Sequence, residues 1–192
     1  MRIRVIPYHQ HSNSAKLLAR SIGAKRLLLK GSRFKPRSRD LLINWGNSSY
    51  ERTTGIILNH PASVTIACNK SYTLQALAAW GIKIPKATTS RRVAEQWLLE
   101  GSQVYSRTLL TSHSGKGIEI NKASQNGSQE LVEAPLYTQA ITGSRREFRI
   151  HVFKGKVFHC QTKKRRNGWR ELENYCDEVR NKHTGWIYSL DT

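Results

Sequence analysis

The chain has 192 residues, enough for one large domain or two small ones. Its 32 Lys and Arg residues against 13 Asp and Glu residues give a formal net charge of +19, which favours a polyanionic partner such as nucleic acid, a ribosome, nucleotide phosphates or an acidic protein. No apolar run is long enough for a membrane span, and no signal peptide is recognisable, so we expect no membrane association and a cytoplasmic location. The three cysteines are widely spaced without a CxxC motif, which indicates neither a zinc site nor a disulfide framework.

The first 49 residues predict a small α/β domain. Strands are expected at Arg2–Pro7, Lys25–Lys30 and Asp40–Trp45, the last one apolar enough to be buried on both faces, and a helix at Ala15–Ile22. This order is typical of a parallel sheet. Loops at the carboxyl ends of such strands usually hold a ligand, so Gly46–Ser49 is either a ligand loop or a plain turn.

The next block predicts helices. Pro61–Cys68 has the pattern of at least one helical turn. Asn69 is a suitable cap for a longer helix over Lys70–Trp80, and Ser90 for another over Arg91–Leu99.

A glycine-containing loop follows the third predicted helix. Two short apolar strands flank the sequence SHSGKG, Ser112–Gly117, and Arg107 lies on the strand that leads in. Glycines allow the backbone to approach a ligand closely, and successive N–H groups can form an anion-binding nest. Lys116 and Arg107 add positive charge suited to phosphate oxygens. The alternative is an ordinary hairpin turn.

The last third predicts an exposed loop, a connector, a hairpin and a tail. The loop is Lys122–Gln129, and the apolar connector Leu131–Ile141 is broken by a proline. Phe148–Phe153 and Lys156–Gln161 alternate strongly across a two-residue turn, which indicates a β-hairpin. The tail holds a short amphipathic stretch, Glu171–Asn181, for which a polar helical face is expected.

Five stretches in this order resemble the ATP-grasp superfamily, in the compact form common in bacteria and phages. They are CNKSYTLQALAAWGIKIPKATT, VYSRTLLTSHSGKGIEI, EAPLYTQAI, REFRIHVFKGKVFHCQTKKRRNGW and VRNKHTGWIY. The resemblance implies an α/β (α+β) fold with a small N-terminal parallel α/β domain, residues 1–66. A truncated two-lobed ATP-grasp domain would follow over residues 67–192, with a glycine-loop lobe at about 86–133, a hinge at 134–139 and a basic hairpin lobe at 140–192.

The resemblance also implies a nucleotide site. Lys70 and Arg107 would approach the ATP phosphates, and Arg149 would reach a phosphate or acyl-phosphate as the catalytic candidate, with Lys163 and Arg165 as further candidates for that duty. The loop covering the phosphates would comprise Ser112, Ser114, Gly115, Lys116 and Gly117. Adenine would be held in the hinge, mostly through backbone groups, by Glu133, Ala134, Leu136, Tyr137 and Gln139. The implied reaction is activation of a carboxylate by the γ-phosphate of ATP, followed by attack of an amine.

One departure from the family pattern concerns the metal. ATP-grasp enzymes hold Mg²⁺ with carboxylates on late strands, and the sequence contains only three aspartates, while its one Glu-x-Asn, Glu119–Asn121, lies beside the glycine loop. Two interpretations remain: another chain supplies the metal-binding half, or the protein is a shortened descendant without catalysis. The alternative function is a non-enzymatic basic protein, possibly phage-encoded and acting in the host cytoplasm, that binds nucleic acid or an acidic host protein. The sequence does not predict the oligomeric state.

Overall fold

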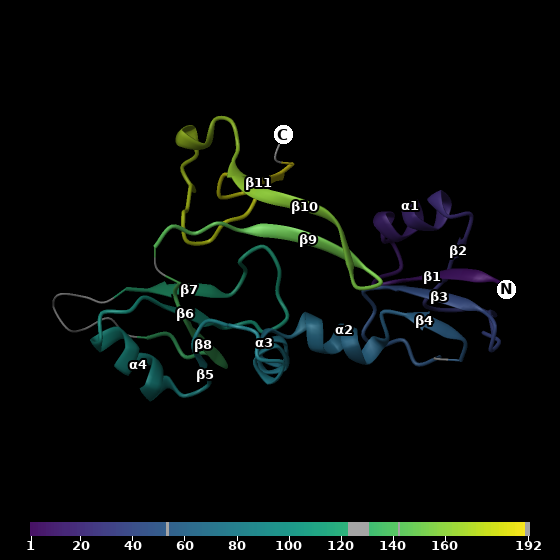
Figure 1. Ribbon diagram of the computed structural model, residues 1–192, viewed down its shortest axis with the longest axis horizontal. Helices are drawn as coiled ribbons and strands as arrows, with labels where there is room; N and C mark the ends of the chain where they lie inside the picture. Colours follow the sequence, from purple (N-terminus) through teal and green to yellow (C-terminus); the bar gives the residue numbers. More distant parts are fainter. Residues whose placement is uncertain (53, 123–130, 142, 191–192) are drawn as a thin grey trace. The chain divides into compact units, whose positions relative to one another are not determined.

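The computed structural model describes residues 1–52, 54–122, 131–141 and 143–190, which form two compact units. The first unit is Met1–Ala76 and the second is Leu77–Thr192 (Figure 1). Apart from its first residue, the exposed loop predicted over Lys122–Gln129 lies outside the described residues.

The first unit contains a four-stranded parallel sheet in the order β2-β1-β3-β4. The strands are β1 (Ile3–Pro7), β2 (Lys25–Arg26), β3 (Leu41–Trp45) and β4 (Ile56–Leu58). This confirms the small parallel sheet predicted from the order of strand, helix and strand.

Three details of this sheet differ from the prediction. The second strand ends after Arg26, because the chain then turns out of the sheet and the Leu29 N–H donates to Oε1 of Gln10 at 2.8 Å. In β3 only alternate residues are fully buried, so one face of the strand is covered more completely than the other. The strand β4 was not predicted.

Side-chain caps set the helix starts in the first unit. Helix α1 (Asn13–Ser21) begins where Oγ of Ser12 accepts a hydrogen bond from the Ala15 N–H. Helix α2 spans Pro61–Cys68, and α3 spans Lys70–Ala79. The predicted Asn69 cap of α3 is confirmed, because its Oδ1 accepts the N–H groups of the first residues that follow.

The second unit begins with an antiparallel sheet in the order β5-β8-β6-β7. Its strands are β5 (Ala87–Thr88), β6 (Val104–Arg107), β7 (Ile118–Asn121) and β8 (Leu136–Gln139). Helix α4 (Arg91–Leu99), capped by Ser90 as predicted, packs on this sheet around a core of Ala94, Val104, Leu131, Ala134 and Tyr137. The segment predicted as a connector is therefore an inner strand of the sheet.

A second sheet, in the order β11-β10-β9, contains the predicted hairpin. Its strands are β9 (Phe148–Phe153), β10 (Lys156–Arg165) and β11 (Trp186–Ser189). The turn residues Lys154 and Gly155 both have positive φ, 48° and 73°, as a tight two-residue hairpin requires. The strand β10 runs four residues further than predicted because β11 pairs with its end.

The tail differs from the predicted amphipathic helix. Only Trp169–Glu171 is helical, as a single 3₁₀ turn, and residues 172–185 follow an irregular path. Local side-chain bonds favour that path: Oδ1 of Asn181 accepts the N–H groups of His183 and Thr184, which competes with helix formation. The segment lies against the β9–β10–β11 sheet, where the indole N–H of Trp186 donates to the Cys176 carbonyl at 2.8 Å.

Within the described ranges, no helix combines the length and the apolar character that a bilayer span requires.

Candidate functional site

A cationic cavity of about 740 Å³ lies in the second unit between the glycine loop and the β9–β10–β11 sheet. It is lined by two loop segments and one face of the sheet: His113, Ser114, Gly115, Arg149, Gln161, Lys163, Arg180, Asn181, Lys182, Trp186, Ile187 and Tyr188. Four of these side chains are Lys or Arg, and no carboxylate is among them.

The register of the sheet brings the cationic side chains to one face. Arg149 on β9 stands opposite Gln161 on β10, and Lys163 on β10 stands opposite Tyr188 on β11. The Arg149 guanidinium lies 3.8 Å from the centre of the Tyr188 ring, and Nζ of Lys163 lies 4.9 Å from it. This aromatic ring therefore helps to orient both cations.

The cationic side chains of this face differ in whether a carboxylate pairs with them. Nζ of Lys163 donates to Oε2 of Glu147 at 2.6 Å and to the Arg180 carbonyl at 2.6 Å, and Arg180 lies 3.7 Å from the same carboxylate. In the described part of the chain no carboxylate pairs with Arg149. Arg149 is therefore the strand cation best placed to receive an anionic ligand.

The glycine loop is folded back on itself and held against the tail. Oγ of Ser112 donates to the Lys116 carbonyl at 2.6 Å, and the Lys116 N–H donates to the His113 carbonyl at 3.2 Å. The Ser114 carbonyl accepts from Nδ2 of Asn181 at 2.9 Å. Gly115 has φ +80°, and a methyl group there would overlap the Val179 side chain.

A second cavity of about 330 Å³ lies beyond the end of β8. Its lining combines apolar and polar side chains: Pro85, Tyr105, Arg107, Thr138, Gln139, Ile141, Ser144, Arg145, Arg146 and Glu147. Nε of Arg107 donates to Oγ1 of Thr138 at 3.1 Å, and burial lowers the pKa of Arg107 from its usual value without removing its charge at neutral pH. Glu147 lines this cavity and also accepts a hydrogen bond from Lys163, which lines the larger one.

Comparison with solved structures identifies the architecture. The D-alanine–D-alanine ligase of Bacillus anthracis matches with a TM-score of 0.59 over 100% of this chain and 72% of its own, at 14% identity. The D-alanyl-alanine synthetase A of Vibrio cholerae O1 biovar eltor str. N16961 matches with a TM-score of 0.58 over 95% of this chain and 77% of its own, at 11% identity. A RimK domain ATP-grasp protein of Sphaerobacter thermophilus DSM 20745 matches with a TM-score of 0.54 over 84% of this chain and 72% of its own, at 14% identity.

The chain has the ATP-grasp fold. No protein-family model and no curated protein sequence matches it. At this level of identity the likeness concerns the fold, so the ATP-grasp site residues must be judged from their own positions.

Some of the residues implied by the ATP-grasp resemblance line the two cavities and others do not. Ser114, Gly115, Arg149 and Lys163 line the larger cavity. Arg107 and Gln139 line the smaller one. Lys70 is the first residue of α3 in the other unit. Ser112, Lys116 and Gly117 belong to the loop but not to the cavity wall.

The residues of the expected hinge lie on strand β8 and just before it. Ala134, Leu136 and Tyr137 have buried side chains, and β8 pairs with a neighbour on each side, so sheet pairing engages much of its backbone. Glu133 is exposed and lies 3.4 Å from Arg91. Gln139, at the end of β8, lines the smaller cavity.

Arg165 lies outside the cavity wall, in an aromatic cluster. Its Nε donates to the Tyr175 hydroxyl at 2.9 Å, and its guanidinium lies 4.6 Å from the Trp169 ring. The bond to Tyr175 is the main cause that raises the pKa of Arg165. This arrangement gives Arg165 a structural role in holding the tail.

Sequence reasoning missed Gln161 on β10 and three tail residues of the larger cavity, Arg180, Asn181 and Lys182. The three tail residues lie in VRNKHTGWIY, which the sequence had indicated only by its resemblance to a family segment. The basic residues of this short stretch were the available signal.

The described residues do not fit the Mg²⁺ that ATP-grasp ligases use. Within the described ranges no group of three or more His, Cys, Asp or Glu side chains is placed to hold a metal ion. Glu147, which contacts two cations of the larger cavity, is already paired with Lys163 and Arg180.

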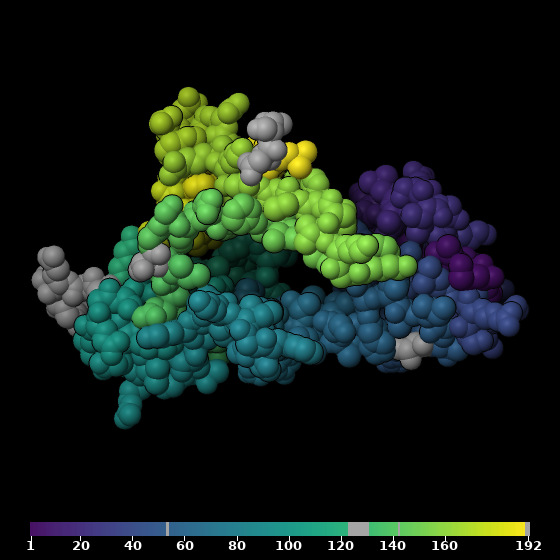
Figure 2. All heavy atoms as spheres, viewed as in Figure 1, coloured from purple at the N-terminus to yellow at the C-terminus, as the bar shows by residue number. Residues whose placement is uncertain are grey.

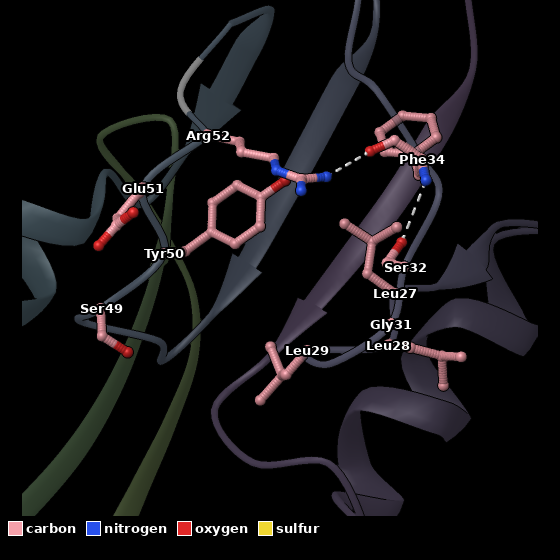
Figure 3. Close-up of a pocket in the computed structure, with 10 residues that line it drawn as sticks. All are labelled: Leu27, Leu28, Leu29, Gly31, Ser32, Phe34, Ser49, Tyr50, Glu51 and Arg52. Carbon is pink, nitrogen blue, oxygen red and sulfur yellow. Dashed lines mark hydrogen bonds between the residues drawn. The ribbon is translucent and has the colours of Figure 1, made fainter.

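The first unit has a smaller cavity of about 230 Å³ at the carboxyl ends of β2 and β3 (Figure 3). Tyr50 and Arg52 enter it from one side, and NH1 of Arg52 donates to the Phe34 carbonyl at 2.9 Å. The Gly46–Ser49 segment contributes Ser49 to the lining, and Nδ2 of Asn47 donates to the Pro7 carbonyl at 3.0 Å, which holds the segment against the end of β1.

Proposed function

We propose that the chain binds ATP through its second unit, as a relative of the carboxylate–amine ligases that share its fold. The triphosphate would occupy the larger cavity under the glycine loop, and the adenine would lie toward Gln139 and Ile141 at the end of β8. The observation that carries the proposal is the cationic cavity itself, in which Arg149 faces no carboxylate of the described residues.

Size and charge both support this assignment. A cavity of about 740 Å³ lies within the range of ordinary ligand sites, roughly 300–1,000 Å³. Arg149, Arg180 and Lys182 would meet the phosphate oxygens, and guanidinium groups can do so in a bidentate way. The apolar lining contributed by Ile141 and Pro85 suits the purine end better than the phosphate end.

The chemistry proposed for a complete site is acyl-phosphate formation followed by attack of an amine. In this chain the contribution of Arg149 would be to hold the transferred phosphoryl group and to offset its developing charge. The glycine loop would cover the phosphates and exclude water. Since the described residues do not form a Mg²⁺ site, the proposal for this chain alone is nucleotide binding.

The experiment is calorimetric titration of the nucleic-acid-free protein with ATP. The wild-type chain should bind with a dissociation constant in the micromolar range, and Arg149→Ala should weaken binding by about tenfold or more, as expected for a lost charge-assisted contact. Arg92→Ala, an exposed change on α4, is the matched control and should bind like wild type. Absence of heat with the wild type, or equal affinity of the Arg149 variant, would contradict the proposal.

The formal net charge of +19 supports a second candidate, a polyanion-binding protein on the same fold. The association constant for an oligonucleotide would then fall as the salt concentration rises, by about 0.7–0.9 log units per neutralised phosphate for each log unit of salt concentration. ATP competition separates the candidates: if ATP does not displace the oligonucleotide and Arg149→Ala does not weaken it, the basic surface rather than the cavity is the binding site.

A further inference from the structure

A cationic loop connects β2 and β3 in the first unit. Residues 1–76 contain thirteen Lys and Arg residues against two carboxylates, Asp40 and Glu51. Four of the cations stand at alternate positions of the loop, and we call them the basic strip: Arg33, Lys35, Arg37 and Arg39. The basic strip is therefore a dense run of one charge in a unit that has few acids to offset it.

Burial alternates along the loop, so that the basic strip faces solvent. All four strip residues are exposed, whereas Ser32, Phe34 and Pro36 are partly covered. The Phe34 side chain packs against a core of buried residues of the sheet, namely Ile6, Leu27 and Leu42. In Figure 2 the chain around these positions, coloured indigo, lies at the surface of the first unit in that view.

Other residues of the first unit hold the backbone of the loop in place. The Lys35 carbonyl accepts a hydrogen bond from the Arg2 side chain at 3.0 Å, and the Phe34 carbonyl accepts one from the Arg52 side chain at 2.9 Å (Figure 3). The guanidinium groups of Arg2 and Arg4 lie 4.6 and 4.8 Å from the centre of the Phe34 ring. Because the backbone is held in this way, the strip cations are positioned before a ligand arrives, and binding costs less conformational entropy.

The basic strip has no acidic partner among the residues that the structure describes. None of their carboxylates forms an ion pair with a strip side chain, and Asp40, the acid next in sequence, binds the Arg2 side chain instead. From the strip, Asp40 accepts only the backbone N–H of Arg37. Clustered charges of one sign raise the local potential and attract ligands of the opposite sign.

The residue types of the loop favour a phosphate backbone over exposed bases. Phe34 is the one aromatic residue in residues 30–40, and its ring already contacts Arg2 and Arg4. Sites for single strands combine cations with aromatic side chains on which bases stack, and the basic strip offers cations alone. A duplex keeps its own bases stacked and presents one negative charge per about 1.7 Å of its axis. The basic strip therefore suits a duplex better than a single strand.

We propose that the basic strip binds the phosphate backbone of a nucleic-acid duplex, without reading its base sequence. The inference rests on the second candidate function, polyanion binding, and assigns that function to a surface of the first unit. It is independent of ATP binding, because the larger cavity lies in the second unit.

The test is fluorescence anisotropy of a labelled DNA duplex of about 20 base pairs, titrated with the full-length, nucleic-acid-free protein at several salt concentrations. The strip variant carries four neutral substitutions: Arg33→Gln, Lys35→Gln, Arg37→Gln and Arg39→Gln. At about 0.1 M salt it should bind about tenfold more weakly than wild type or worse. The slope of log affinity against log salt should become shallower by about 3 to 4 units, since each lost phosphate contact removes about 0.9.

The matched control removes the same total charge at exposed positions elsewhere: Lys16→Gln, Arg20→Gln, Lys83→Gln and Arg92→Gln. It should bind the duplex with nearly the affinity and slope of wild type. Arg149→Ala should also bind the duplex like wild type. The strip variant should keep its circular dichroism spectrum and its ATP affinity, because the strip side chains form no hydrogen bond or ion pair with the described residues.

The outcomes separate this inference from the functions proposed above. If the wild-type chain fails to bind the duplex at low salt, both the inference and the polyanion-binding candidate are wrong, and ATP titration of the same preparation still tests the cavity. Equal losses in the strip and control variants would overturn the inference alone and leave total charge as the cause of binding.

Three further results would also overturn the inference. A loss in Arg149→Ala as large as that in the strip variant would assign the duplex to the cavity. Tighter binding of a single strand of the same length would assign the surface to stacked bases. Binding of polyglutamate without binding of the duplex would assign it to an acidic protein.

Discussion

At the scale of single residues, Asp40 fixes the start of the first sheet. Its carboxylate accepts the backbone N–H and Nε of Arg2, both at 3.1 Å, and the N–H of Arg37 at 2.8 Å. The side chain is almost inaccessible to solvent. The hydrogen bonds from the Arg2 side chain are the main reason that the pKa of Asp40 lies well below its usual value.

Asp40→Asn should therefore lower the thermal midpoint by several degrees at neutral pH. Because the folded-state pKa lies below the unfolded value of about 3.9, the carboxylate stabilises the fold above that pH, and this contribution is lost as the pH falls through the folded value. The difference between wild type and variant should shrink accordingly below about pH 4. The control Glu95→Gln breaks an exposed pair with Arg91 and should change little. A constant difference from pH 7 to pH 3 would contradict this account.

Gly115 of the glycine loop lies against Val179 of the tail. Gly115→Ala should weaken ATP binding by about tenfold, because the methyl group overlaps Val179 and adds the strain of a positive φ. Gly23→Ala has a similar φ of +64° in open space and should leave ATP affinity unchanged. Adding Val179→Ala to the Gly115 variant should restore part of the affinity. Titration of all four proteins measures this, and wild-type affinity of Gly115→Ala would refute it.

At the scale of elements, the sequence predicted the features that depend on neighbouring residues, namely helix caps and a tight hairpin turn. Ser12, Asn69 and Ser90 located three helix starts, and strict alternation with a two-residue turn located the hairpin. The strands β4 and β8 escaped prediction because each is short and is stabilised by neighbours distant in sequence. The helix predicted for the tail is absent for a related reason, because side chains there form hydrogen bonds to nearby backbone groups and these bonds compete with helix formation.

The inner strand β8 depends on one buried tyrosine. The Ala134 N–H donates to the Tyr137 hydroxyl at 2.9 Å, and Tyr137 is fully buried. Tyr137→Phe should lower the free energy of unfolding by about 1–3 kcal/mol, because it leaves a buried N–H without an acceptor. Urea unfolding measures the loss, with the exposed Tyr72→Phe as control. Equal midpoints for wild type and Tyr137→Phe would show that the bond contributes nothing.

At the scale of the whole molecule, the order of motifs predicted the ATP-grasp fold, which the comparisons show. The sequence placed the glycine loop and Arg149 in one site, and in the structure they line one cavity. It did not indicate that Glu147 would neutralise Lys163 or that Arg180 and Lys182 would join the cavity. Arg180 and Lys182 belong to the irregular tail, and the alternation of apolar and polar residues does not predict the course of an irregular segment.

The net charge also predicts how binding responds to salt. Raising NaCl from about 0.05 M to about 0.5 M should weaken ATP binding, since screening acts on the exposed Arg149 and Lys182. Adenosine, which lacks phosphates, should bind weakly with little salt dependence. Titrations at matched pH measure both ligands. If adenosine showed the same salt response as ATP, the cationic cavity would not be the source of the affinity.

The most direct test of the account is hydrogen–deuterium exchange of the full chain with and without saturating ATP. Protection should appear at residues 112–117 of the glycine loop and 179–188 of the tail and β11, while helix α1 (Asn13–Ser21) should exchange as before. Protection confined to other segments, or unchanged exchange at saturation, would contradict the assignment of the cavity as the nucleotide site.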